Sequence, residues 1–174
     1  MLARIAKLEM LRPRLFVPSI FAIDLEGLYA DGLRGLIVDL DNTLVPWNEP
    51  AVPAALAAWV ARARRLSFGL CVVSNNRAPR VDAFADQLGL PRIAEAAKPR
   101  RRAFREAMRI MGTVAETTAV IGDQLFTDVL GGNRLRLYTI LVLPLAEREF
   151  WTTRWVRRLE RQFHPRRDDG RRYG

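Results

Sequence analysis

The sequence predicts an α/β protein of Rossmann-like type, a three-layer sandwich in which a mostly parallel sheet lies between two layers of helices. Short apolar runs alternate along the chain with longer runs of helical periodicity. The apolar runs are continuous, as in GLIV at residues 35–38, whereas a half-exposed strand would alternate apolar and polar residues. Alternating β and α segments of this kind indicate parallel strands joined by helices.

Each expected strand is a short apolar run that ends in polar residues. We expect strands at residues 35–41, 68–76, 92–97, 117–123 and 137–143. Pro53 fits the first turn of a helix, and Gly89 and Gly112 are placed where helices should stop. We expect helices at residues 53–66, 78–90, 101–112, about 126–135 and about 146–163.

The length of 174 residues suits one domain. We expect that domain over residues 1–163, with basic terminal segments, and a disordered basic tail over residues 164–174. Cys71 is the sole cysteine, so an intrachain disulfide and a cysteine-based metal site are excluded. Because the chain also lacks a long apolar stretch and a secretory leader, we expect a cytoplasmic protein without a transmembrane segment.

The net charge of +9 is concentrated at the two ends of the chain. Residues 1–14 carry +3, and residues 147–174 carry +4 from nine arginines and five acids. The segment 150–163 also places Trp151 and Trp155 on one helical stripe with arginines beside it, a pattern typical of a membrane interface. The ends could therefore meet an anionic membrane at its inner face or another polyanion. The alternatives are a solvated surface and a stripe that packs on the sheet.

Polar residues gather at the carboxyl ends of the expected strands, where open α/β sheets bind ligands. Asp39, Asp41, Ser74 and Asp123 all lie there. Neighbouring carboxylates at one edge repel each other unless a cation lies between them. Because no histidine or cysteine cluster is present, an all-oxygen site for Mg²⁺ is the expected solution, and such sites usually handle phosphate. Lys98 can supply a second positive charge.

The motifs DLDNT, SNN, KP and GDQLFTD resemble the four motifs of the haloacid dehalogenase (HAD) superfamily of phosphatases in order and spacing. More closely, LIVDLDNTLVPWN, VVSNN and IGDQLFTDVLGGNR resemble the YqeG-like, IIIA-type subgroup. That subgroup is related to the phosphatidylglycerophosphate phosphatases of mitochondria and plastids. The likeness covers roughly residues 12–145.

The resemblance implies a role for each motif residue. Asp39 would be the nucleophile that becomes an aspartyl-phosphate, and Asp41 would be the general acid and base. Thr43 would hold the loop that carries both acids. Ser74, Asn75 and Lys98 would bind the transferred phosphoryl group.

The same resemblance implies a metal site. Asp123 would bind Mg²⁺ together with Asp39 and the backbone carbonyl of Asp41, and Asp128 would support the metal directly or through water. Each residue also has a purely structural reading: strand-end caps for the acids, a turn for Ser74, a surface position for Lys98 and a helix N-terminal charge for Asp128. Asn133 would brace the aspartate loop or be an ordinary polar residue at a helix end.

The spacing between the motifs leaves no room for a cap domain over the site. Asp41 and Ser74 are 33 residues apart, and Ser74 and Lys98 are 24 residues apart. These gaps hold only the helices and strands of the sheet itself, so we expect an open site. An open site suits a phosphate carried on something larger, or an oligomer that supplies the missing cover.

Three functions follow from these features. The first is a Mg²⁺-dependent phosphomonoesterase acting on phosphatidylglycerophosphate or a similar anionic lipid. The second is a 3′-phosphatase for nucleic acid or another small-molecule phosphatase, although no aromatic-rich basic groove is recognisable. The third is a non-catalytic HAD-fold interaction protein, which the retention of both acids in DLDNT argues against.

One position departs from the resembled subgroup. There, a glycine with positive φ usually follows GGNR, but this chain has Leu135, Arg136 and Leu137. A non-glycine residue in the left-handed conformation costs about 1 kcal/mol, so the shape of this turn is in question.

Overall fold

The computed structural model describes residues 9–47 and 49–145. The helix expected at about 146–163, the tail 164–174 and the first eight residues of the basic N-terminal segment lie outside these ranges. Among the described residues, no helix is long and apolar enough to cross a membrane.

Six strands form one sheet in which every neighbouring pair is parallel. Their order across the sheet is β1-β6-β5-β2-β3-β4. The strands are β1 (Leu15–Val17), β2 (Gly35–Val38), β3 (Gly69–Val73), β4 (Arg92–Ile93), β5 (Thr118–Gly122) and β6 (Tyr138–Val142). This confirms the α/β, Rossmann-like class that the sequence predicts.

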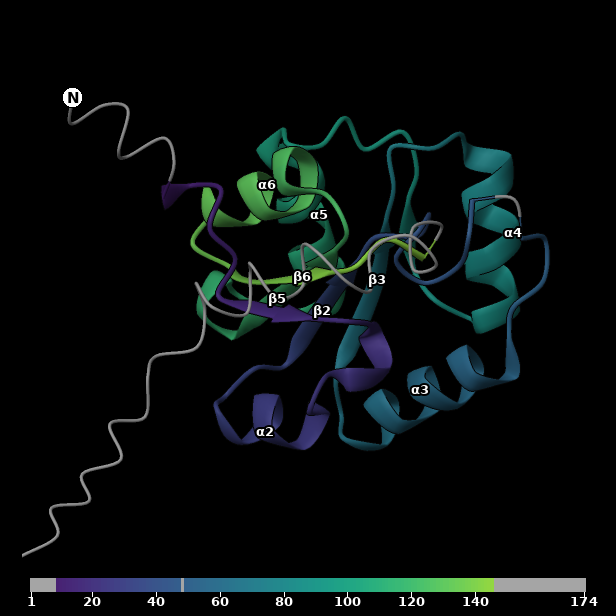
Figure 1. Ribbon diagram of the computed structural model, residues 1–174, viewed down its shortest axis with the longest axis horizontal. Coiled ribbons are helices and arrows are strands. Elements are labelled where there is room, and N and C mark those ends of the chain that lie inside the picture. The colour runs from purple at the N-terminus through teal and green to yellow at the C-terminus, as the bar shows by residue number, and fades with distance from the viewer. Residues whose placement is uncertain (1–8, 48, 146–174) are drawn as a thin grey trace, which may run out of the picture.

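Helices connect the strands and cover both faces of the sheet, as Figure 1 shows. The α-helices are α2 (Leu25–Ala30), α3 (Ala54–Arg65), α4 (Ala78–Leu88), α5 (Arg101–Met111) and α6 (Leu130–Asn133). Shorter turns are the 3-10 helices Ile20–Ala22 and Ala115–Thr117 and the π-helix Leu125–Val129. Gly89 and Gly112 end α4 and α5 in the left-handed conformation, with φ of 60° and 66°, as expected.

The central strand β2 explains why the apolar runs are continuous. Leu36 and Val38 belong to the core on the side of α3 and α4, whereas Ile37 belongs to the core on the side of α5. Successive side chains of a strand point to opposite faces, so a strand covered on both sides must be apolar at every position. The four residues of β2 are all buried.

The structure adds elements that the sequence did not reveal. The edge strand β1 and helix α2 were not expected, and the helix expected at about 126–135 begins as a π-helix before it continues as α6. The turn after it does keep the left-handed conformation, with Arg136 at φ 61° in place of the usual glycine. The departure from the subgroup's glycine therefore leaves the shape of the turn intact.

Asn133, at the end of α6, holds the N-terminal segment against the sheet. Its side-chain amide donates to the carbonyls of Met10 and Arg12 at 2.9 and 3.0 Å. Its Oδ1 accepts a bond from Thr139 Oγ1 at 3.0 Å, in β6. Asn133 thus braces the edge of the sheet where β1 enters, and does not contact the aspartate loop.

The motif-bearing loops leave the sheet without an inserted domain in the described part of the chain. Between β2 and β3 the chain forms one loop and α3, and between β3 and Lys98 it forms α4 and the two-residue strand β4. Both segments pack on the sheet as part of the sandwich. The carboxyl edge of the strands therefore carries no cap within residues 9–47 and 49–145.

Candidate active site

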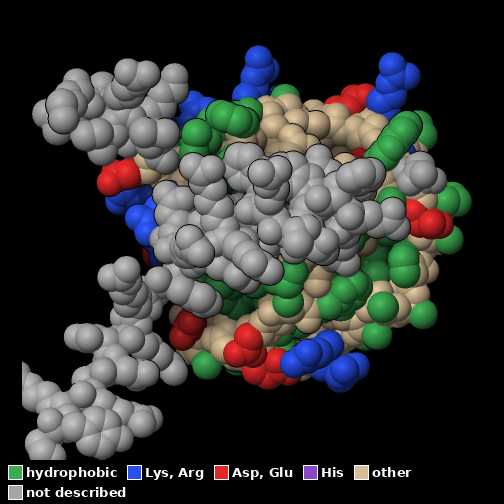
Figure 2. Space-filling view, viewed as in Figure 1, with side chains coloured by type: hydrophobic (Ala, Val, Ile, Leu, Met, Phe, Trp, Pro, Cys, Tyr) green, Lys and Arg blue, Asp and Glu red, His purple; other side chains and the backbone are tan. Residues whose placement is uncertain are grey.

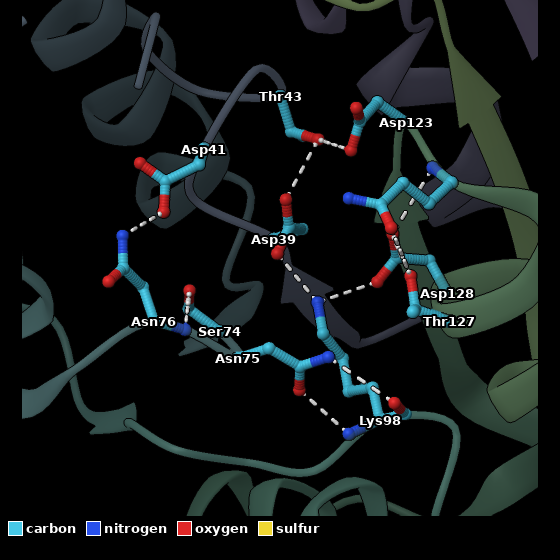
Figure 3. A network of polar contacts seen from close by, with 11 residues as sticks. Asp39, Asp41, Thr43, Ser74, Asn75, Asn76, Lys98, Asp123, Thr127 and Asp128 are labelled. Atoms are coloured by element: carbon cyan, nitrogen blue, oxygen red, sulfur yellow. Dashed lines mark hydrogen bonds and ion pairs between the residues drawn. The ribbon is translucent and has the colours of Figure 1, made fainter. Parts of the chain in front are cut away.

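Four parallel strands bring the predicted site residues to one edge of the sheet. Asp39 follows β2, Ser74 follows β3 and Asp123 follows β5, while Lys98 lies in the loop after β4. The strands are neighbours in the sheet, so side chains that are far apart in sequence converge (Figure 3).

Asp39 lies at the centre of this group and is 7% exposed. Its backbone N–H donates to the carbonyl of Ile121, which extends the β2–β5 pairing by one residue and fixes where the side chain begins. Lys98 Nζ donates to Asp39 Oδ1 at 2.6 Å, and Thr43 Oγ1 lies 3.3 Å from Asp39 Oδ2. Both carboxylate oxygens of Asp39 therefore have a donor.

Lys98 is a buried cation shared by two carboxylates. Its Nζ lies 2.6 Å from Asp39 Oδ1 and 2.6 Å from Asp128 Oδ1. Burial by itself would lower the pKa of Lys98, but the facing carboxylates of Asp128 and Asp39 outweigh it and raise that pKa above its usual range. The lysine is thus held charged in the interior.

Asp128 reaches the group because of an unusual helix and a glycine. It lies in the π-helix Leu125–Val129 and is 1% exposed. Its Oδ2 accepts from Gln124 N and Thr127 Oγ1, both at 3.3 Å. A Cβ added to Gly122 would come 2.3 Å from Asp128 Cγ, so the carboxylate can lie there only because residue 122 has no side chain.

Asp123 completes a cluster of three carboxylates with Asp39 and Asp128, whose potential ligand oxygens all lie within 4.8 Å of one another. Burial raises the pKa of Asp123 to about 6, and the charge of Asp128 adds to the effect. Burial likewise raises the pKa of Asp39 to about 7, although the charge of Lys98 opposes the rise. A single lysine does not neutralise three acids, of which Asp39 and Asp128 are buried and Asp123 is half-buried.

This donor set fits a hard divalent cation. It supplies oxygen ligands alone, and they lie within 4.8 Å of one another. Burial is the main cause of the raised pKa values of Asp39 and Asp123, and the charge of Asp128 adds to it. The carboxylate of Asp41 is not part of this cluster. The resemblance implies a ligand from the backbone carbonyl of Asp41 instead.

The Asp41 side chain is turned toward a different set of partners. Asn76 Nδ2 donates to its Oδ2 at 3.0 Å, and Arg80 Nε donates to its Oδ1 at 2.7 Å. In Figure 3 the carboxylate points toward Asn76 and away from Asp39. Directly after Asp41 the chain turns, and Asn42 adopts φ 63°.

The loop after β3 positions the other polar residues. Ser74 is buried, and its Oγ accepts a bond from the backbone N–H of Asn76 at 3.1 Å. Asn75 binds the backbone of Lys98 twice, accepting from its N–H at 2.7 Å and donating to its carbonyl at 3.3 Å. Asn75 therefore fixes the peptide that carries Lys98, whereas the sequence suggested contact with the substrate itself.

Sequence reasoning missed Arg80 and the role of Asn76. Asn76 is part of SNN, and a polar residue directly after a strand was a usable signal. Arg80 gave no signal, because it is one arginine among many and only the fold shows that it lies beside Asp41.

Comparison with known proteins places the chain in a family. A family model described as "HAD-hyrolase-like" matches residues 95–149. The chain is 44% identical over 150 residues to "Probable phosphatase YqeG" of Bacillus subtilis, which covers 86% of this chain and 87% of that protein. The chain belongs to the YqeG-like phosphatases of the HAD superfamily. It is therefore a phosphoric monoester hydrolase by family.

More distant similarities agree with this assignment. The chain is 29% identical to the chloroplastic phosphatidylglycerophosphate phosphatase 1 of Chlamydomonas reinhardtii, over 83% of this chain and 62% of that longer protein. The cobalt-bound deoxy-D-mannose-octulosonate 8-phosphate phosphatase of Haemophilus influenzae has the same fold, with a TM-score of 0.51. That match covers 63% of this chain and 68% of the other at 19% identity, so it bears on the fold alone. Phosphatases of this superfamily generally use a divalent metal.

Proposed function

We propose that this HAD phosphatase is Mg²⁺-dependent, works through an aspartyl-phosphate on Asp39, and acts on an anionic lipid phosphate such as phosphatidylglycerophosphate. The observation that carries the mechanism is the contrast between two neighbouring acids. Asp39 is buried among Lys98, Thr43 and two further carboxylates, whereas Asp41 lies outside that cluster. This contrast supports Asp39 as the nucleophile and Asp41 as the group that transfers the proton.

In the first half of the reaction, an oxygen of Asp39 attacks phosphorus and the bond from phosphorus to the ester oxygen breaks. Asp41, in its protonated form, gives its proton to that oxygen, so the alcohol leaves neutral. Lys98 and the hydroxyl of Ser74 donate to the phosphoryl oxygens, whose negative charge needs nearby donors. Thr43 donates to Asp39 and keeps its carboxylate in line.

In the second half, water attacks the phosphorus of the aspartyl-phosphate. Asp41, now ionised, takes a proton from that water, the bond from phosphorus to Asp39 breaks, and inorganic phosphate leaves. Both acids return to their starting states, so no further reactant is needed. Asn75 contributes by fixing the Lys98 backbone through two hydrogen bonds.

Asp39, Asp123 and Asp128, with the backbone carbonyl of Asp41, would hold the Mg²⁺. The bound cation supplies positive charge that favours the ionised form of Asp39 and offsets the charge on the phosphoryl group. Without it, burial raises the pKa of Asp39 and thereby favours the protonated carboxyl. A protonated carboxyl is a poor nucleophile. A cation that favours the ionised form of Asp39 would therefore be needed for the attack on phosphorus.

The lipid substrate is supported by the open edge of the sheet and by the charge distribution. The site residues lie at an edge that carries no cap in the described ranges, which favours a phosphate presented on a larger body such as a bilayer. The relative in Chlamydomonas reinhardtii is named for phosphatidylglycerophosphate. In Figure 2, Lys and Arg side chains of the described residues are seen around the margin of the face in view.

The direct test is phosphate release from a panel of lipid, nucleotide, nucleic-acid 3′-end and sugar phosphates with Mg²⁺ present. We expect the highest kcat/KM with phosphatidylglycerophosphate. A clear preference for nucleic-acid ends would establish the second function instead. Turnover of none of them, with the purified protein folded, would favour a non-catalytic interaction protein.

Metal dependence is tested in the same assay. Excess chelator should abolish turnover and added Mg²⁺ should restore it, whereas Ca²⁺ should inhibit, because it prefers longer bonds and more ligands than Mg²⁺. Such a change would misalign Asp39 with phosphorus. Undiminished turnover in chelator would contradict the metal requirement.

Membrane contact is tested by co-sedimentation with vesicles. Residues 1–14 and 147–174 together carry seven of the nine net positive charges. Each basic residue near an anionic surface contributes about 1 kcal/mol, and salt screens exposed charges beyond about 8 Å at physiological ionic strength. We expect binding to anionic but not neutral vesicles, weakened by salt. Equal binding to both, or to neither, would leave the basic ends with another role.

A further inference from the structure

Arg80 connects the Asp41 carboxylate to the loop that follows it. Arg80 lies in the first turn of α4, and its Nε donates to Asp41 Oδ1 at 2.7 Å. Its two terminal nitrogens donate to the carbonyls of Pro46 at 3.0 Å and Glu49 at 3.3 Å. The guanidinium thus holds the acid and the loop with one planar group.

These contacts hold Asp41 away from the nucleophile. Arg80 binds one of its carboxylate oxygens and Asn76 binds the other, and in Figure 3 Asn76 lies on the side of Asp41 that is turned away from Asp39. A proton donor must come within hydrogen-bond reach of the oxygen that leaves phosphorus. Asp41 therefore has to exchange these partners before the first half-reaction can proceed.

The ion pair lies where a substrate can reach it. The side chains of Arg80 and Asp41 are 22% and 19% exposed, in contrast to the buried Lys98–Asp39 pair at 3% and 8%. Three hydrogen bonds leave other N–H groups of the Arg80 guanidinium unused among the described contacts. A guanidinium with free donors binds phosphate or carboxylate oxygens well.

We propose that Arg80 forms a subsite for a second anionic group of the substrate, and that filling this subsite frees Asp41 to turn toward Asp39. The substrate class is then a phosphomonoester that carries another anion, such as a phosphodiester, a few bonds away. The proposal rests on the proposed phosphatase mechanism and deepens it.

The coupling follows from competition for one cation. An anion that pairs with Arg80 displaces Asp41 from the guanidinium. Such an anion therefore binds more tightly to the conformation in which Asp41 is released than to the conformation in which Arg80 still holds Asp41. A ligand shifts an equilibrium by its difference in affinity for the two states. Substrates with a second anion would therefore activate the acid as they bind, and substrates without one would not.

Three substrates separate the contributions. Glycerol phosphate carries one phosphate, glycerophosphoglycerol phosphate adds a phosphodiester without acyl chains, and phosphatidylglycerophosphate in mixed micelles adds the chains. We expect the wild-type protein to prefer the second substrate over the first by about tenfold or more in kcat/KM, the scale of a charge-assisted hydrogen bond. Any additional preference for the third measures the lipid surface.

Substitution of Arg80 tests the origin of that preference. Arg80→Gln should lower kcat/KM for the phosphodiester-bearing substrates by about tenfold more than for glycerol phosphate, because only those substrates lose a contact with the guanidinium. Arg92→Gln is the matched control. Arg92 also forms ion pairs with α4, to the carboxylates of Asp82 and Asp86, each at 2.6 Å. The Arg92→Gln variant should keep the wild-type preference for the second anion.

Several results would overturn the proposal: no wild-type preference for the second anion, equal losses on all three substrates in Arg80→Gln, or no loss at all. If Arg80→Gln does not fold, Arg80→Lys decides, since lysine keeps the charge but lacks the planar fork. The preference of the Arg80→Lys variant for the second anion must fall several-fold. An unchanged preference would contradict the proposal. Failure of the wild-type protein to release phosphate from any substrate would instead refute the proposed function.

Discussion

Asp39 and Asp41 are two residues apart in the chain and lie in opposite surroundings. Asp39 shares a buried lysine with a second carboxylate, and its pKa is raised to about 7 chiefly by burial. Asp41 is partly exposed and is bound by Arg80 and Asn76. In the proposed mechanism the same type of side chain serves two tasks, because the fold surrounds Asp39 with a lysine and further acids and places an arginine beside Asp41.

The largest effect should come from removing the buried carboxylate, that of Asp39. Asp39→Asn should reduce turnover by about a thousandfold or more, because an amide is a poor nucleophile and a weak metal ligand. At pH 8 the variant should melt no lower than the wild-type protein, since the substitution removes a charge from a crowded site. Steady-state kinetics and thermal melting check both parts, and substantial residual turnover would refute the nucleophile assignment.

Removing the partly exposed carboxylate, that of Asp41, should have a smaller and more selective effect. Asp41→Asn should slow alkyl phosphates by about a hundredfold, the usual scale of general acid–base catalysis. The loss should be smaller for the release of 4-nitrophenol from an aryl phosphate, because that leaving group needs little protonation. Rates for the two substrate types should therefore diverge, and equal losses would argue against Asp41 as the acid.

The buried surroundings of Asp39 and Asp128 depend on close packing at Gly122, unlike the partly exposed surroundings of Asp41. Gly122→Ala would force a Cβ to within 2.3 Å of Asp128 Cγ, so we expect destabilisation of about 1–3 kcal/mol together with weaker Mg²⁺ binding. Gly69→Ala at the opposite edge of the sheet is the control. Its added Cβ would lie 3.1 Å from Met111 Cβ, so it should cost less stability and spare metal binding. Denaturant unfolding and Mg²⁺ titration compare the two.

The smallest expected effect is a pH dependence of the protein's stability that arises from Asp39 and Asp123. Asp39 and Asp123 hold their protons up to pKa values of about 7 and 6 in the fold, whereas their ordinary value is 3.8. The metal-free folded chain thus binds more protons than the unfolded chain in this window, and its stability should fall as pH rises through it. Mg²⁺ competes with those protons, so it should raise the melting temperature more at pH 8 than at pH 6. The reverse order would contradict the shifts.

The features that follow from local sequence could be predicted, and those that depend on distant contacts could not. Continuous apolar runs fixed the inner strands, because burial on both faces leaves a pattern within each run. The edge strand β1 has three residues, and its partner β6 comes more than a hundred residues later in the chain, so its pattern is too short to recognise. The HAD resemblance named the acids, yet Arg80 beside Asp41 required the packed position of α4.

The same logic applies to the position of Asp128. Its motif was recognisable, but its approach to Lys98 depends on the π-helix Leu125–Val129 and on the missing side chain of Gly122. A π-helix has no simple sequence pattern, since it differs from an α-helix only in how the turn closes. Residue types were therefore predictable at this edge, and their mutual orientation was not.

The position of β1 has a consequence for synthesis of the chain. In the sheet, β1 pairs only with β6, the last strand described, whereas β2, β3 and β4 are neighbours in both sequence and space. On the ribosome, the Leu15–Val17 segment must wait for Tyr138–Val142 to emerge before it can pair, while the other half of the sheet can begin to form. Until then this short apolar segment stays unpaired, so the edge of the sheet is completed last.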